Sequence, residues 1–321
     1  IEAGINGSRF STVSGTDSSN HAIFGGFYKV VPCIRLFLPQ APLSTETIEL
    51  EGKVYLIGEK SFDSYVPKST DSLYYPVTGK YRFRYLNQLT LSIQDGRALY
   101  PYAVNVQVQQ AASFYRLNFN LHYFFNYAAA GGLAVRVFGA KFGYLGARNP
   151  AEDLTRFEPK LTAVRGSEDY TYGNYFVGRN DFQGLASQQI MMRDGDLKLR
   201  TDLFQGLQGR SDDWVAAINF RSTLPGQIVP AWLPLRLFLD VGTYAQAWSE
   251  NPPTSHFLYV GGFELDLFQD VLRVYAPLVY SNDFSRQLKT VPGENGFFHK
   301  VSFSIDFQNL PFRKWLGYTP F

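Results

Sequence analysis

The chain has 321 residues, of which 18% are charged, below the roughly 25% of a typical soluble domain. Aromatic residues reach 17%, with 28 Phe and 21 Tyr, residue types that favour β-strands and membrane interfaces. The net charge of +2, without a basic stripe, excludes a nucleic-acid footprint, and the single Cys33 excludes a disulfide framework.

The clearest predicted element is a β-strand at residues 115–123, "YRLNFNLHY". Its odd positions are apolar or aromatic, whereas its even positions are Arg116, Asn118, Asn120 and His122. A period of two places these two sets on opposite faces of one strand. The same alternation recurs along the chain and predicts six further lumen-facing residues on the polar face: Arg136, Arg236, Asp240, Glu264, Asp266 and Arg273.

The alternation predicts strands from one end of the chain to the other, and helical patterns are nearly absent. In chain order the predicted strands are 1–14, 21–39, 46–61, 79–94, 102–110, 113–127, 132–145, 182–193, 196–205, 213–224, 234–248, 256–268, 270–281 and 297–308. No stretch approaches the ~20 consecutive apolar residues of a membrane-spanning helix. We therefore expect an all-β protein.

Strand length and aromatic placement separate two kinds of β-protein. The predicted runs are about 10–15 residues long, against about 5–6 in globular strands and about 9–11 for crossing a membrane. Aromatic residues gather near strand ends, as at 123–127 and 142–144. The mean hydropathy of −0.16 is uninformative, because polar lumen-facing residues offset apolar lipid-facing ones. These features favour a transmembrane antiparallel up-and-down β-barrel of about 14 strands (range 12–16) over a soluble β-sandwich.

The predicted connections differ in length between the two ends of this barrel. On the side of the longest one, 146–181, lie 15–20, 62–78, 111–112, 206–212, 249–255 and 282–296, of which 111–112 is the exception in being a short turn. On the opposite side lie 40–45, 95–101, 128–131, 194–195, 225–233 and 269. Outer-membrane barrels have long extracellular loops and short periplasmic turns. With an even strand count, we expect both termini in the periplasm and 146–181 on the cell surface.

The long connection 146–181 contains the candidate loop or plug residues Arg165, Tyr170, Tyr172 and Arg179. Connections of this length are usually functional or disordered, and this one is expected to fold into the lumen, cap the pore or bind a partner. Within it, "VRG" (164–166) resembles the Arg-Gly loop motif of the outer-membrane insertase and two-partner-secretion superfamily, whose Arg docks on the inner barrel wall. The loop follows the seventh predicted strand, which is earlier than in that superfamily.

The end of the chain contains a candidate assembly signal. "GFFHKVSFSIDF" (296–307) resembles the targeting signal on the last strand of outer-membrane barrels, with Gly296 followed by Phe303, Ile305 and Phe307 in alternation. This resemblance implies the barrel-assembly machinery as a partner during biogenesis. We expect residues 1–308 to form the barrel and 309–321 to form an interfacial tail at the periplasmic leaflet of the outer-membrane lipid.

Catalytic and metal-binding patterns are missing from the sequence. The four histidines, His21, His122, His256 and His299, are scattered, and neither HExxH, paired Cys nor a G-x-S-x-G elbow occurs. The acidic turns "TDSSN" (16–20) and "RDGD" (193–196) do not match a calcium loop. We therefore expect no catalytic residue, cofactor or metal in this chain, and interpret His122 as a hydrogen-bonded lumen residue.

Several short sequence segments, taken in chain order, resemble those of one protein family. "FGGFYK", "YLIGEKSF", "RYLNQLTLSI", "ALYPY", "VQVQQAASFYRLNF", "YFFNYA", "VRVFGAKFGYLG", "DDWVAAINFRSTLP" and "LRLFLDVGTY" resemble the C-terminal region of very large gluzincin-family aminopeptidase-like proteins of outer-membrane bacteria. In that family a zinc metallopeptidase domain precedes a barrel. The resemblance implies an outer-membrane anchor, and a conduit, for a periplasmic peptidase, but it carries no catalytic residue onto this sequence.

Three functions stay open at this stage. The first is the anchor, and it fits a chain that begins Ile-Glu-Ala with no Met or leader, as expected for a fragment of a longer protein. The second is a stand-alone outer-membrane pore or translocation barrel that passes peptides or small solutes through its lumen. The third is a soluble β-sandwich binding module.

Overall fold

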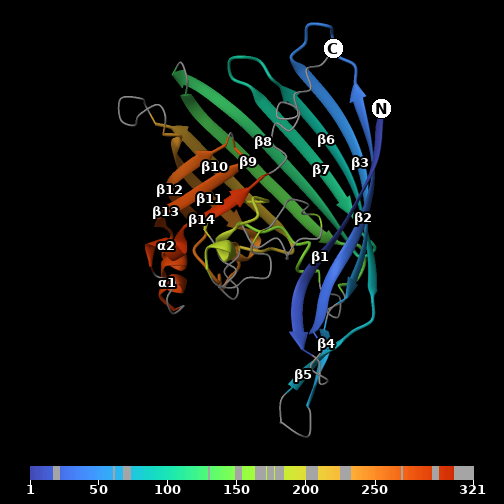
Figure 1. Cartoon of the computed structure of the whole chain (residues 1–321). Helices are drawn as coiled ribbons and strands as arrows, with labels where there is room; N and C mark the ends of the chain where they lie inside the picture. Colours follow the sequence, from blue (N-terminus) through green and yellow to red (C-terminus); the bar gives the residue numbers. More distant parts are fainter. Residues whose placement is uncertain are drawn as a thin grey trace.

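The computed structural model describes residues 1–16, 22–60, 62–67, 74–128, 131–148, 154–162, 171, 177, 184–199, 209–224, 233–268, 270–290 and 296–306. Twelve strands form one antiparallel sheet in the order β1-β2-β3-β6-β7-β8-β9-β10-β11-β12-β13-β14 (Figure 1). Their bounds are β1 Glu2–Thr16, β2 Ala22–Leu38, β3 Glu46–Lys60, β6 Arg82–Asp95, β7 Tyr102–Gln110, β8 Phe114–Ala128, β9 Gly131–Tyr144, β10 Trp214–Thr223, β11 Leu235–Tyr244, β12 Leu258–Leu267, β13 Leu272–Tyr280 and β14 Ser302–Ile305.

The sheet is strongly curved but not closed. Figure 1 shows the strands bending around the described stretches 154–162 and 184–199, which lie in the hollow of the sheet. Among the described residues β1 pairs with β2 alone, and β14 pairs with β13 and makes an isolated parallel bridge from Phe303 to Gln189. The sheet therefore has two edges, at β1 and β14.

The prediction of an all-β, antiparallel chain in which sequential strands pair is confirmed. Twelve of the predicted strands correspond to the twelve strands of the sheet. A separate hairpin, β4 (Phe62–Pro67) and β5 (Tyr74–Thr78), occupies the predicted loop 62–78.

Two predicted strands, 182–193 and 196–205, are wrong in their described part. Residues 184–199 form a 3-10 helix, η2 (Leu185–Gln188), and an irregular extended run with a turn at 194–195, while 200–205 lie outside the described residues. Leu197, Lys198 and Leu199 are all buried, because this run lies against the inside of the sheet instead of joining it. Their alternation reflects two kinds of contact, apolar and ionic, and does not reflect a ladder of paired strands.

Short helices were also not predicted. The helix α1 (Asn282–Thr290) follows β13, and its Phe284 and Leu288, one turn apart, are buried. The Asp283 carboxylate in its first turn accepts a hydrogen bond from the Ser255 amide at 3.2 Å. The last predicted strand, 297–308, starts later than expected, since Phe297–Lys300 form the helix α2, and η3 (Ala245–Trp248) follows β11.

Strand directions place the connections at two ends of the sheet. The end where β1 begins and β14 stops, which we call the terminal end, is the side of the connections 39–45, 96–101, 129–130, 224–234 and 268–271. The opposite end, the loop end, has 17–21, 61–81, 111–113, 145–213, 245–257 and 281–301. The connections thus fall on the two sides as predicted, and the short connection 111–113 on the loop side is the exception that the sequence also predicts.

The two faces of the sheet differ in chemistry. On β8 the even positions Arg116 and Asn118 are 2% and 6% exposed, whereas the odd positions Leu117 and Phe119 are 42% and 40% exposed. The charged face is therefore the inner one, and the apolar face is the outer one. Toward the loop end the inner face changes to an apolar core that includes Phe27, Ile57, Phe114, Phe142 and Leu258.

Candidate functional site

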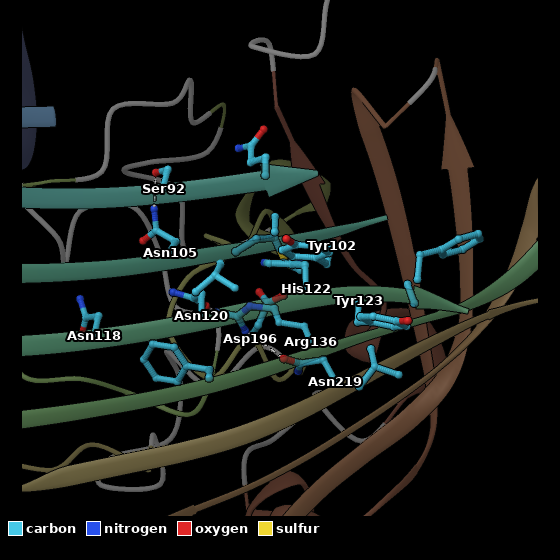
Figure 2. A pocket seen from close by; sticks show the side chains of 18 of the residues that line it. Ser92, Tyr102, Asn105, Asn118, Asn120, His122, Tyr123, Arg136, Asp196 and Asn219 are labelled. Carbon is cyan, nitrogen blue, oxygen red and sulfur yellow. Dashed lines mark hydrogen bonds between the residues drawn. The ribbon is translucent and has the colours of Figure 1, made fainter. Parts of the chain in front are cut away.

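The main feature of the interior is a polar cavity of about 1120 Å³, which we call the inner cavity. It lies between the inner face of β3 and β6–β10 and residues 192–198, and it reaches the turn 96–101 and Asp306 at the terminal end (Figure 2). Figure 2 shows Ser92, Asn105, Asn120, His122 and Arg136 arranged across neighbouring strands along its wall.

Toward the loop end the interior is filled by two described stretches, 154–162 and 184–199, which we call the inner segment. Leu154 and Phe157 pack into the cluster around Phe114 and Phe142, with the Phe157 ring 4.8 Å from that of Phe114. Leu161, Leu197 and Leu199 are fully buried in the second cluster. Apolar packing thus fills this half of the hollow.

The inner segment is fixed to the sheet through the turn at Asp194. The Arg116 guanidinium forms an ion pair with the Asp194 carboxylate and donates a 3.0 Å hydrogen bond to the Phe157 carbonyl. Arg136 donates to the Asp194 carbonyl at 2.6 Å and to Asn120 at 2.5 Å. Asp194 has a φ of 57°, in the left-handed region that Asp tolerates better than most residues.

A second attachment joins the inner segment to the centre of β11. Lys198 Nζ lies 2.9 Å from Asp240 Oδ1, and both side chains are almost completely buried. Asn219 on β10 donates to the same Asp240 oxygen at 2.9 Å and to the Gly195 carbonyl at 3.0 Å. A buried charge pair of this kind needs such additional hydrogen bonds to offset its desolvation.

Further ion pairs lie near the terminal end of β10–β13. Arg221 lies 3.1 Å from the buried Glu264, Arg236 lies 2.9 Å from Asp266, and Arg273 lies 2.9 Å from Asp270. These charges are of both signs and are close to one another, so they neutralise each other within the interior.

Uncharged side chains form the opposite wall of the inner cavity. Asn105 donates to Ser92 at 3.0 Å, and Asn118 donates to Gln107 at 2.8 Å. The strand register explains these contacts, since Ser92 lies opposite Asn105, and Asn105 lies opposite Asn120. Neighbouring β6, β7 and β8 thus present a continuous surface of amides and hydroxyls.

The predicted lumen residues all lie on the inner side of the sheet, in two groups. Five of them, Arg116, Asn118, Asn120, His122 and Arg136, contact the inner segment or line the inner cavity. The other five, Arg236, Asp240, Glu264, Asp266 and Arg273, belong to the ion pairs described above. The expected hydrogen bond of His122 is not found among the described residues.

The candidate loop residues Arg165, Tyr170, Tyr172 and Arg179, and the "VRG" stretch, lie outside the described residues. In the candidate assembly signal, Ser302 and Ser304 are buried while Phe303 and Ile305 are partly exposed, and Gly296 precedes α2. Phe307 and the predicted tail 309–321 lie outside the described residues.

Some residues of the interior were not identified from the sequence. Asp194 and Lys198 sit in a stretch predicted as two strands, so nothing local indicated that they reach Arg116 and Asp240. Asn105, Gln107 and Asn219 occupy polar positions of alternating strands, and this alternation would have been enough to include them.

No group of three or more His, Cys, Asp or Glu that could hold a metal ion occurs among the described residues. In the inner segment, burial raises the pKa of the Glu158 carboxyl, although the Arg210 guanidinium 3.0 Å away opposes this shift.

A search for membrane-spanning helices finds none among the described residues that is long and apolar enough.

Comparison of the chain with protein-family models and with curated proteins finds no match in either set.

Proposed function

We propose that this chain is an outer-membrane β-barrel domain that anchors a periplasmic metallopeptidase domain preceding Ile1. The observation that carries the membrane part is the outer face. Leu89, Val108 and Leu117 are cross-strand neighbours, as are Leu91, Val106 and Phe119, and each of the six is 36–51% exposed. Continuous apolar surface of this kind is rare on soluble monomers and is expected where lipid is the solvent.

Aromatic residues bound this apolar band at both ends. On β8, the segment from Tyr115 toward the loop end to Tyr123 toward the terminal end contains nine residues, within the roughly 9–11 with which a tilted strand crosses the hydrocarbon. The Tyr115 ring covers Gly143, and the Tyr28 ring covers Gly58, where any Cβ would overlap the ring. At the other end the Tyr123 ring lies 4.5 Å from Phe125. Such belts sit at the two membrane–water interfaces.

The inner face supports the same proposal. Charged side chains point away from the apolar face and are paired with each other, as lumen-facing residues of a membrane barrel are. The packed inner segment favours the anchor over an open pore, because it fills the loop-end half of the hollow. A soluble sandwich would need a second sheet on the apolar face, and the twelve strands form a single sheet.

The peptidase part of the proposal rests on the resemblance in sequence and on the position of the ends. β1 begins and β14 stops at the same end of the sheet, so a domain ahead of Ile1 would lie on the side of the short turns. That side is the periplasm in outer-membrane barrels. The chain itself is proposed to have no hydrolytic activity.

Site-directed spin labelling tests the lipid contact directly. In a Cys33→Ser background, Phe119→Cys on the outer face and Asn105→Cys on the inner face are labelled with a nitroxide in liposomes. The Phe119 label should be accessible to oxygen and shielded from a water-soluble nickel chelate, and the Asn105 label should show the reverse. Equal nickel accessibility at both sites would contradict membrane insertion.

A further inference from the structure

Several of the charges around the inner cavity are paired with protein groups, whereas one buried carboxylate oxygen of Asp196 has no hydrogen-bond partner among the described residues. Lys198 pairs with Asp240, and Arg221 pairs with Glu264. Arg136 donates to Asn120, to Asn219 and to the Asp194 carbonyl. A charged ligand would have to compete with these contacts, so the interior favours an uncharged ligand.

The wall formed by β6, β7 and β8 retains hydrogen-bonding capacity. Asn105 uses an N–H toward Ser92, and its carbonyl oxygen has no partner among the described residues. Asn120 uses its carbonyl oxygen toward Arg136, and its NH₂ group has none there. Because Asn105 and Asn120 face each other across adjacent strands, an acceptor and a donor lie side by side.

His122 adds to this wall. It lines the inner cavity two residues beyond Asn120 on β8, and it has no hydrogen bond to a described residue. A neutral imidazole offers one donor and one acceptor. The three side chains Asn105, Asn120 and His122, which lie on neighbouring strands of this wall in Figure 2, therefore offer both donors and acceptors.

The inward positions of β6, β7 and β8 within 90–94, 103–107 and 118–122 have polar or small side chains, and the aromatic residues Tyr55, Phe124 and Phe138 line other parts of the inner cavity. By strand alternation, the inward positions are Thr90, Ser92 and Gln94 on β6, Ala103, Asn105 and Gln107 on β7, and Asn118, Asn120 and His122 on β8. A sugar presents hydroxyls that both donate and accept hydrogen bonds, and these match the amides and hydroxyls of this wall. The volume of about 1120 Å³ is slightly above that of typical small-molecule sites, which hold about 300–1,000 Å³.

From these observations we infer that the inner cavity binds a short, uncharged oligosaccharide, held by Asn105, Asn120 and His122. The cavity reaches the turn 96–101 and Asp306, so the ligand enters from the terminal end. This site does not depend on the peptidase proposal, since every residue involved belongs to this chain.

Isothermal titration calorimetry on the full chain tests the inference. The protein is held in an amine-oxide detergent, because maltoside and glucoside detergents would compete for the site. The probes are maltotetraose, cellotetraose, mannotetraose and tri-N-acetylchitotriose. At least one should bind with saturation, and an Asn105→Leu/Asn120→Leu double variant should weaken that binding about tenfold or more, because two hydrogen bonds are lost.

Asn87→Leu is the matched control. It is an amide on β6 that faces outward and bonds Gln110 at 2.9 Å, so its loss should leave sugar affinity unchanged. Circular dichroism melting checks that the variants fold. If the double variant does not fold, the single variant His122→Ala is tested in its place. Absence of binding by all four sugars, or equal affinity in wild type and folded variants, overturns the inference. Tighter binding of an uncharged Gly-Ser-Asn hexapeptide, lost in the same variants, would overturn it in favour of a peptide site.

Discussion

Lys198 and Asp240 form a buried ion pair, with Nζ and Oδ1 2.9 Å apart, that joins the inner segment to the middle of β11. Asp240 is completely buried and also accepts a hydrogen bond from Asn219. Removing one partner leaves the other charge buried and unpaired, which costs far more than losing an exposed pair.

Asp240→Ala is therefore expected to lower the free energy of unfolding by about 3–5 kcal/mol. Chemical denaturation in detergent micelles, followed by Trp fluorescence, measures this change. Lys141→Ala, which breaks a half-exposed pair with Asp213, should cost less than about 1 kcal/mol. The double variant Lys198→Met/Asp240→Leu should recover most of the loss, and equal costs for Asp240→Ala and Lys141→Ala would show that the pair is not important for stability.

The attachment of the inner segment through Arg116 and Arg136 leads to a second prediction. These guanidiniums hold the Asp194 turn and the Phe157 carbonyl against β8 and β9. The double variant Arg116→Ala/Arg136→Ala should loosen the segment, raise conductance in planar lipid bilayers and speed tryptic cleavage at Arg193 or Lys198.

Arg97→Ala is the comparison for this experiment, since Arg97 lies in the turn 96–101 and bonds the Tyr100 carbonyl at 2.9 Å. It should behave as wild type in both measurements. If the Arg116/Arg136 variant conducts no better than Arg97→Ala, the inner segment is held by its apolar packing alone.

The strands of the sheet could be predicted because the alternation of polar and apolar residues within each strand indicates which side chains face inward and which face outward. In β8, alternation alone separates Arg116 and Asn118 from Leu117 and Phe119, and the structure places these pairs on opposite faces. Period two is a local signal, and it needs no knowledge of which strands are neighbours.

The inner segment could not be predicted for the same reason. Leu197, Lys198 and Leu199 alternate like a strand, but their partners lie far away in sequence, as Asp240 does for Lys198. Alternation indicates an extended chain in two environments and does not say whether a ladder partner exists. The helix α1 had a weak local signal, since Asp283 follows Asn282 at its start and Phe284 and Leu288 are spaced by one turn.

Orientation provides a third prediction. Leu43, in the turn 39–45, is almost fully exposed at the terminal end, and Asn251 is exposed at the loop end. In a Cys33→Ser background, Asn251→Cys should react with a membrane-impermeant maleimide in intact cells. Leu43→Cys should react only after the outer membrane is permeabilised. The opposite pattern would place the long connections in the periplasm and an N-terminal peptidase outside the cell.

The two edges of the sheet give the last prediction. An unpaired backbone edge in lipid leaves N–H and C=O groups without partners, at several kcal/mol for each group. β1 and β14 run in opposite directions, so they could pair as antiparallel neighbours and close the sheet. One contact stands in the way, because the Ile190 amide donates a 2.8 Å hydrogen bond to the Phe303 carbonyl, and Gln189 bridges Phe303. We expect membrane insertion to replace this contact with β1.

Disulfide cross-linking measures this closure. By alternation Ala3, Ile5 and Gly7 lie on the outer face of β1, and Phe303 lies on the outer face of β14. With Cys33→Ser, Phe303→Cys is combined in turn with Cys at 3, 5 and 7. One combination should cross-link under mild oxidation in outer-membrane vesicles and give a species whose gel mobility no longer changes on boiling. Cys at Gly4, on the inner face, should cross-link poorly with the same partner. If no outer-face pair cross-links in vesicles while Gln189→Cys with Phe303→Cys does, the inner segment stays on β14 and the sheet remains open in the membrane.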